Sequence, residues 1–307
     1  MARSNGSVAE GSQRVDVRKT YKLYLGGAFA RSESGRSYPV TDARGRFLAN
    51  ASMASRKDAR DAVVAARSAF AGWSGATAYN RGQVLYRVAE VMEGRREQFV
   101  GEVAAGEGLT RSRAGTAVEA AIDRWVWYAG WTDKIAQVAG AANPVAGPYF
   151  NLSVPEPTGV VAVLAPQASS LLGLVSVVAP VLASGNTCVV LAAQHRPLPA
   201  VTLSEVLATS DLPGGVLNLL TGVTAEVAPW LASHEDVNGL DLTGAAGAPE
   251  VSWGELEAAA ASTLTRVFRP GGAGAAAEEP DWTAEPDGPR RILAFCETKT
   301  VWHPKGR

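Results

Sequence analysis

Hydrophobic positions recur with helical spacing in the first half of the chain and form continuous runs in the second half. The first helical tract opens at Ser55, and Asp58 three residues later completes a capping-box pattern. A second tract starts at about Asn80, and a third runs through Trp125. These spacings predict three amphipathic helices. Before them, the sequence KLYLGGAF at 22–29 predicts a short strand entering a Gly-Gly turn.

From Gly159 onward, apolar runs alternate with helical runs. The apolar runs are GVVAVLA, TCVVL, VLNLL and VNGLDL. Continuous apolar strands joined by helical crossovers predict a doubly wound α/β fold, with a parallel sheet covered on both faces. Ligands of such folds bind beyond the carboxyl ends of the strands. The segments expected there are 165–168, 191–194, 221–228 and 243–247.

The pattern changes after a last predicted helix, from about Glu250 to Arg266. Residues 269–290 are rich in Gly, Ala, Pro and acidic residues and have no periodicity, which predicts a linker. The chain then alternates again, and Arg291 to His303 are predicted to form one extended strand.

Composition excludes several classes of function. The chain has 307 residues, 47% of them hydrophobic, which is ample for a packed core. Its formal charge of −1 and its lack of a basic run exclude nucleic acid as a partner. No secretory signal or long apolar span is found, so no membrane contact and a cytoplasmic location are expected. Two cysteines fit a reducing compartment, and three widely separated histidines predict no metal site.

Four segments resemble, in order, the signatures of the aldehyde dehydrogenase superfamily. They are PEPTGVVAVLAP (155–166), LASGNTCVVLAAQHRPLP (182–199), SDLPGGVLNLLTG (210–222) and DVNGLDLTGA (236–245). The ETKTVW sequence near the end resembles the closing strand of that superfamily. The stretches IDRWVWYAGWTDK and ANPVAGPYF look most similar to the degenerate second module of the family 16 aldehyde dehydrogenases.

The resemblance implies a division of the chain into parts. A nucleotide-binding domain of the aldehyde dehydrogenase type is expected, together with a small antiparallel oligomerisation sheet, and the catalytic domain is expected to be missing. The expected parts are a disordered tail at 1–20, a Rossmann-like domain at 21–141 and 159–268, an oligomerisation hairpin and closing strand at 142–158 plus 291–307, and a linker at 269–290 that replaces the catalytic domain.

The resemblance also implies that the catalytic residues are absent. The nucleophilic cysteine of the family belongs to the missing domain, and neither Cys188 nor Cys296 is expected to replace it. The asparagine that donates to the oxyanion matches Ala168, which has no donor. The general base matches the FRPGG stretch, where Arg269 and Pro270 stand.

Cofactor binding is expected to be weak for the same reason. The family's contacts to the dinucleotide match Leu191, Gln194, Thr224, Ala228 and Ala245, none of which keeps the expected residue type. The vestigial cofactor-binding residues that remain are Pro166, Thr243 and Gly244. NAD is therefore possible but expected to bind weakly, and no cofactor is assigned firmly.

Three functions follow as hypotheses. The favoured one is a non-catalytic subunit, a pseudoenzyme, that structurally or allosterically supports a full-length aldehyde dehydrogenase in a hetero-oligomer and also self-associates. The first alternative is an active NAD(P)-dependent aldehyde dehydrogenase with an unusual site. The second alternative is a nucleotide-binding sensor that uses the domain without chemistry.

Overall fold

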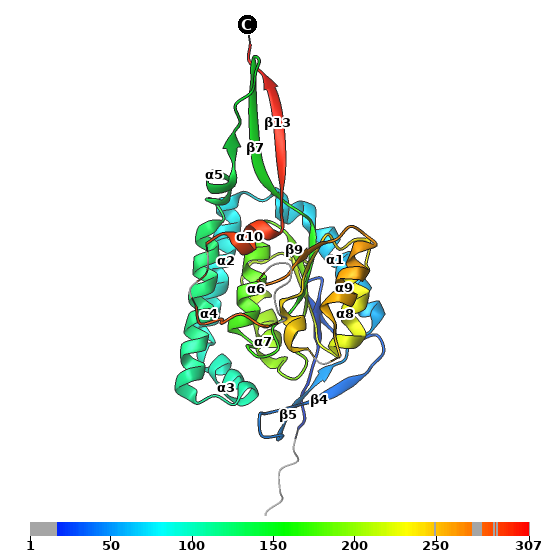
Figure 1. Cartoon of the computed structure of the whole chain (residues 1–307). Coiled ribbons are helices and arrows are strands. Elements are labelled where there is room, and N and C mark those ends of the chain that lie inside the picture. Colours follow the sequence, from blue (N-terminus) through cyan, green and yellow to red (C-terminus); the bar gives the residue numbers. More distant parts are fainter. Residues whose placement is uncertain (1–16, 249, 272–277, 285, 287, 307) are drawn as a thin grey trace, which may run out of the picture.

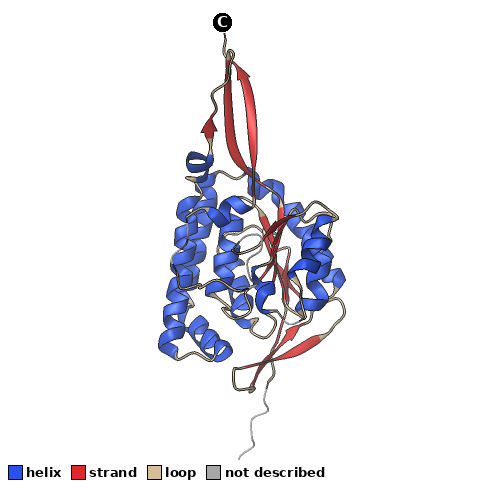
Figure 2. Ribbon diagram, viewed as in Figure 1, coloured by secondary structure: helices blue, strands red, loops and turns tan. Residues whose placement is uncertain are grey.

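The computed structural model of the chain describes residues 17–248, 250–271, 278–284, 286 and 288–306. Its body is an α/β domain, and a narrow two-stranded ribbon projects from that body (Figure 1). Figure 2 shows helices on both sides of the central strands. The predicted doubly wound fold is confirmed.

The central sheet has seven strands in the order β12–β11–β8–β9–β10–β2–β3. The five strands from β12 to β10 are parallel, and β2 joins the edge of β10 in the antiparallel direction. All residues of β8 and β9 are buried, as expected for a sheet covered on both faces. The strands are β2 (Leu23–Leu25), β3 (Ala28–Ala30), β8 (Val160–Leu164), β9 (Thr187–Leu191), β10 (Leu217–Leu220), β11 (Gly239–Asp241) and β12 (Arg266–Phe268).

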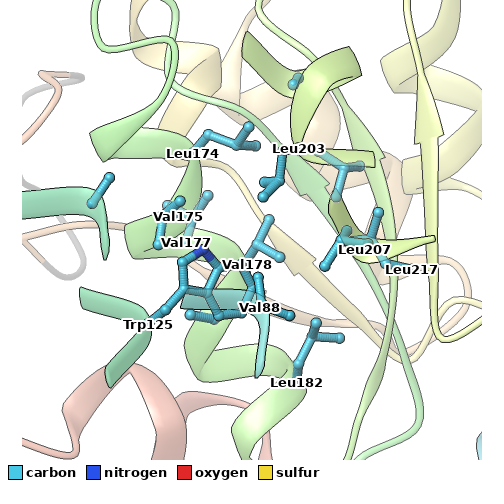
Figure 3. Packing of buried hydrophobic residues seen from close by; sticks show 14 of the residues in the cluster. Val88, Trp125, Leu174, Val175, Val177, Val178, Leu182, Leu203, Leu207 and Leu217 are labelled. Atoms are coloured by element: carbon cyan, nitrogen blue, oxygen red, sulfur yellow. The ribbon is translucent and has the colours of Figure 1, made fainter. Parts of the chain in front are cut away.

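Two hydrophobic clusters lie on opposite faces of this sheet. Val161 and Val163 of β8 belong to one cluster and Val160 and Ala162 to the other, following the alternation of side chains along a strand. Figure 3 shows Trp125 packed among the valines of the first cluster. The helices that cover the first face are α2 (Ala78–Gly94), α3 (Arg96–Glu107), α4 (Arg111–Trp131), α6 (Leu172–Ala183) and α7 (Leu198–Leu207). The helices that cover the second face are α1 (Arg56–Gly75), α8 (Thr224–Ala232) and α9 (Trp253–Ala261).

The predicted capping box at the start of α1 is confirmed. The hydroxyl of Ser55 accepts from the backbone N–H of Asp58 at 3.3 Å, and the Asp58 carboxylate accepts from the Ser55 N–H at 2.8 Å. Asp58 also accepts from the hydroxyl of Ser32 at 2.7 Å, which joins the helix start to the strand-rich N-terminal region.

The projecting ribbon consists of β7 (Tyr149–Pro157) and β13 (Cys296–Pro304), which pair antiparallel over nine residues. The two-residue strand β6 (Ala141–Ala142) pairs with the other edge of β7, next to the short helix α5 (Ile135–Ala139). A separate sheet near the N-terminus contains β1 (Thr20–Tyr21), β5 (Phe47–Ser52) and β4 (Ser37–Thr41). The sequence patterns did not predict this last sheet.

Two boundary predictions are wrong. The helix expected from Glu250 to Arg266 ends at Ala261, and the chain then enters β12, which adds a parallel strand beside β11. The strand expected from Arg291 to His303 begins only at Cys296, because Arg290–Ala294 form helix α10. That turn brings Ile292 and Phe295, three residues apart, into the core together.

Candidate functional site at the carboxyl ends of the parallel strands

The loops that follow β8, β9 and β11 meet beside the described part of the segment between β12 and α10. A short helix, η1 (Thr243–Gly247), lies in the loop after β11. Between these loops is an open cavity of about 460 Å³. Its lining residues are Gln167, Ala168, His195, Arg196, Ala246, Gly247, Glu278 and Glu279. The site therefore lies where a doubly wound fold is expected to place a ligand.

A carboxylate of the chain itself, that of Glu279, lines this cavity. Oε1 of Glu279 accepts from the backbone N–H of Gln167 at 2.6 Å and from that of Ala168 at 3.2 Å. Its other oxygen, Oε2, accepts from the indole N–H of Trp282 at 3.3 Å. One side-chain carboxylate thus meets three N–H donors.

Two glutamines connect the neighbouring loops. The backbone N–H of Gln194 donates to Oε1 of Gln167 at 2.9 Å, and the N–H of Thr224 donates to Oε1 of Gln194 at 2.9 Å. Thr224 is the first residue of α8, so a neutral side-chain oxygen meets a free amide at that helix start. The amides that an anionic cofactor would approach here already have acceptors within the chain.

The remaining residues that match the family's cofactor contacts are buried. Leu191 and Ala245 lie in the hydrophobic cluster beneath α1 and α8, together with Ala228. The hydroxyl of Thr224 is buried and, within the described residues, has no hydrogen-bond partner. Buried side chains therefore stand at these positions in place of the polar contacts to a dinucleotide that the resemblance implies.

The three vestigial positions come together near the ends of β8 and β11, and each has a contact inside the protein. Pro166 is buried close to Gly173, where an added Cβ would lie 2.9 Å from Cβ of Pro166. The hydroxyl of Thr243 donates to the carboxylate of Asp241. An added Cβ at Gly244 would lie 2.1 Å from the carbonyl oxygen of Ala165. Each of the three residues thus has a contact within the protein, either a hydrogen bond or close packing.

Both thiols lie away from the cavity. Cys188 is completely buried in β9, and burial raises its pKa well above the ordinary value. Cys296 opens β13 and donates to the carbonyl oxygen of Ile292; burial is the main cause that raises its pKa to about 11. A nucleophilic cysteine needs a lowered pKa and an exposed sulfur, and neither thiol meets both conditions.

Sequence reasoning missed Glu279, Trp282 and Arg196. Glu279 and Trp282 belong to the predicted linker, yet Trp282 is only 9% exposed, and buried Arg124 donates to its carbonyl oxygen at 3.3 Å. A single tryptophan within a Gly- and Pro-rich stretch was the only available signal. Across the described ranges, no helix has the length and hydropathy to cross a membrane, and no group of three or more potential ligands could hold a metal.

Comparison with known proteins decides the family. The profile of the aldehyde dehydrogenase family matches residues 29–268. The chain belongs to this family. The cytosolic 10-formyltetrahydrofolate dehydrogenase of Mus musculus is 32% identical over 268 residues, which are 85% of this chain and 29% of that protein. The mitochondrial aldehyde dehydrogenase family 2 member B4 of Arabidopsis thaliana is 35% identical, over 76% of this chain and 44% of that protein.

Solved structures of two longer proteins share the fold. HpcC from Thermus thermophilus superimposes with a TM-score of 0.75 at 28% identity, over 81% of this chain and 47% of that one. An aldehyde dehydrogenase from Bacillus cereus, solved as an NAD+ complex, gives a TM-score of 0.74 at 26% identity, over 81% of this chain and 50% of that one. The chain thus spans half or less of the length of the relatives and solved structures that it matches. Only residues 269–289 separate β12 from α10, too few for another α/β domain at that point.

Proposed function

We propose that this chain is a non-catalytic aldehyde-dehydrogenase-like subunit that supports a catalytically complete aldehyde dehydrogenase. The observation that carries the proposal is the projecting ribbon of β7 and β13, which presents an apolar face and an edge that no strand of the described residues pairs with. We place the complex in a reducing compartment, the cytoplasm, because both cysteines are free thiols.

The chemistry of the described residues supports a non-catalytic role. Aldehyde oxidation by a thiol enzyme needs a thiolate, an oxyanion donor and a base. The two thiols are held in their protonated form. Ala168 has only a methyl group where the family has an amide, and Arg269 is paired with Glu257 at 3.5 Å. These positions therefore hold no reactive thiolate, no side-chain amide donor and, where the family has its base, an arginine instead of a carboxylate.

The ribbon supports a docking role. Leu152 of β7 lies directly opposite Val301 of β13, and Phe150 and Val154 lie on the same face two residues to either side of Leu152. All four side chains are exposed, with exposed fractions between 38% and 54%. A face of this kind on a projecting element is typical of an interaction surface.

The edge of the ribbon identifies the kind of partner. The sheet order β13–β7–β6 leaves the outer edge of β13 without a partner strand in the described chain. Such an edge invites pairing with a strand of another chain. We propose that the sheet of a complete aldehyde dehydrogenase covers it, and that a second copy of this chain associates through the nucleotide-binding domain.

Co-purification tests the proposal. The chain is co-expressed with a full-length aldehyde dehydrogenase from the same source, and the mass of the complex is measured. The double variant Leu152→Lys, Val301→Lys should lose the partner, because two ammonium groups would be placed on the apolar face. Tyr79→Lys is the matched control: Tyr79 is 71% exposed on α2, in the body of the protein, and its variant should keep the partner. A wild-type chain that stays alone beside the enzyme would contradict the proposal.

The two alternative functions have their own measurements. An active aldehyde dehydrogenase would reduce NAD(P) in the presence of aldehydes, and a nucleotide sensor would bind NAD or an adenine nucleotide in calorimetry. We expect NAD to bind no more tightly than about millimolar, because the amides of the cleft are already satisfied. A dissociation constant in the low micromolar range would favour the sensor.

A further inference from the structure

We propose that the backbone amides of Gln167 and Ala168 and the indole of Trp282 form a carboxylate-binding site, which Glu279 of the same chain closes. This proposal does not depend on partner binding. It assigns a ligand class, small or side-chain carboxylates, to a place that the family's cofactor chemistry does not explain.

The donors have the geometry of a built site. Two consecutive amides converge on one oxygen, Oε1 of Glu279, and Trp282 meets the other oxygen. Hydrogen bonds to a charged acceptor are stronger than neutral ones. Each of the two carboxylate oxygens therefore has at least one donor, so the arrangement of donors matches the shape of a carboxylate.

Arg196 positions the amides. Its Nη1 donates to the carbonyl oxygen of Gln167 at 3.1 Å and to that of Ala168 at 2.9 Å. Holding these two carbonyls fixes the orientation of the loop that carries both amides, and the guanidinium adds a positive charge next to the site. Arg196 thus acts on a bound carboxylate through the loop.

Gly247 allows the carboxylate to approach closely. An added Cβ at this residue would lie 3.0 Å from Oε1 of Glu279 and 3.2 Å from Cβ of Gln167. The cavity beside the carboxylate stays open, so a free ligand can reach the donors if Glu279 turns away. Glu279 is half-buried, whereas the adjacent Glu278 is exposed.

Chemical rescue tests the site. Removing the side chain with Glu279→Ala leaves the three donors around a hole of carboxylate size. Acetate should fill this hole and stabilise the folded state. If the dissociation constant is near 10 mM, 100 mM acetate should raise the folding equilibrium constant about tenfold. Sodium chloride at equal ionic strength should not do so.

Two variants separate a site from a charge effect. Glu279→Gln loses the charge but keeps the volume, so its filled hole should give no acetate response. Glu278→Ala removes a neighbouring charge and should behave like the wild type. Stabilisation by acetate in either variant, to the same extent as in Glu279→Ala, would overturn the proposal.

The amide resonances of Gln167 and Ala168 provide a second readout. Acetate should shift both resonances in Glu279→Ala and leave them unchanged in Glu279→Gln. Stabilisation without these shifts would place acetate elsewhere and contradict the site. A Glu279→Ala chain that folds only in acetate counts as the same rescue, and one that stays unfolded in acetate counts against it.

Discussion

The guanidinium of Arg291 lies 3.1 Å from the carboxylate of Asp241, and so links the start of the closing segment to a strand of the central sheet. The Asp241 side chain is only 1% exposed and that of Arg291 17%. Arg291 also lies over the rings of Phe268 and Trp282, at 4.8 Å and 5.3 Å from their centroids. The short connection between β12 and α10 is therefore tied to the domain at its far end.

Removing the cation should destabilise the fold strongly. Arg291→Met leaves the buried carboxylate of Asp241 without its countercharge, and we expect a loss of about 3–5 kcal/mol in the free energy of unfolding. Adding Asp241→Asn to this variant should recover much of the loss, since no buried charge is then left unpaired. Urea denaturation measures the free energy of unfolding of the single and the double variant. An Arg291→Met variant within about 1 kcal/mol of the wild type would show that the pair is dispensable.

The contrast between Ser55 and Arg291 shows what sequence could predict. The Ser55–Asp58 capping box and the buried parallel strands are local patterns, so the spacing of residues along the chain predicts both. The Asp241–Arg291 pair joins residues 50 positions apart, and the Glu279–Gln167 contact joins residues 112 apart. No spacing rule connects such residues, so the closed site was not predicted.

The thiols should be almost unreactive in the native protein. With a pKa of about 11, Cys296 is a thiolate in only about one molecule in ten thousand at pH 7. We expect iodoacetamide to modify neither cysteine at an appreciable rate until the chain is unfolded, and NAD reduction with simple aldehydes to stay at the blank. Mass spectrometry of labelled protein and absorbance at the NADH band check these outcomes. Activity that disappears in Cys188→Ala or Cys296→Ala would contradict this expectation.

Glu107 should make the stability depend on pH. Burial, the largest cause, raises its pKa above the ordinary 4.5, although the N–H and hydroxyl of Ser170 both donate to it. The folded state thus holds this proton more tightly than the unfolded state does. The resulting stability is fully present below pH 4.5 and is lost as the pH rises through the raised pKa.

Glu107→Gln removes this titration, so its free energy of unfolding should depend less on pH than that of the wild type. Between about pH 4 and pH 7, the free energy of unfolding of the variant should rise relative to that of the wild type. Urea denaturation at each pH measures this difference. Glu235→Gln, at an exposed residue, is the control for loss of one negative charge. If the free energy of unfolding varies with pH in the same way in the wild type and in Glu107→Gln, Glu107 does not contribute to the pH dependence of stability.

Gly244 is the position at which the family resemblance and the packing give different explanations. The resemblance assigns it to the cofactor, whereas the structure places an added Cβ 2.1 Å from the carbonyl oxygen of Ala165 and 2.3 Å from that of Leu164. Both obstacles are backbone atoms at the end of β8, which cannot move without disturbing the sheet. We therefore expect Gly244→Ala to lower the free energy of unfolding by about 1–3 kcal/mol or more, with no nucleotide present.

Gly130→Ala is the matched control, because Gly130 is exposed in α4 and an added Cβ would meet nothing within 4 Å. Alanine in a helix should stabilise that variant by about 0.5–1 kcal/mol, so the two substitutions should have opposite signs in thermal unfolding. If Gly244→Ala unfolds like the wild type, packing does not require this glycine, and a bound ligand becomes the better reason for it. A loss of stability in the absence of any ligand would instead mean that a residue typical of a cofactor site is needed here by the sheet itself.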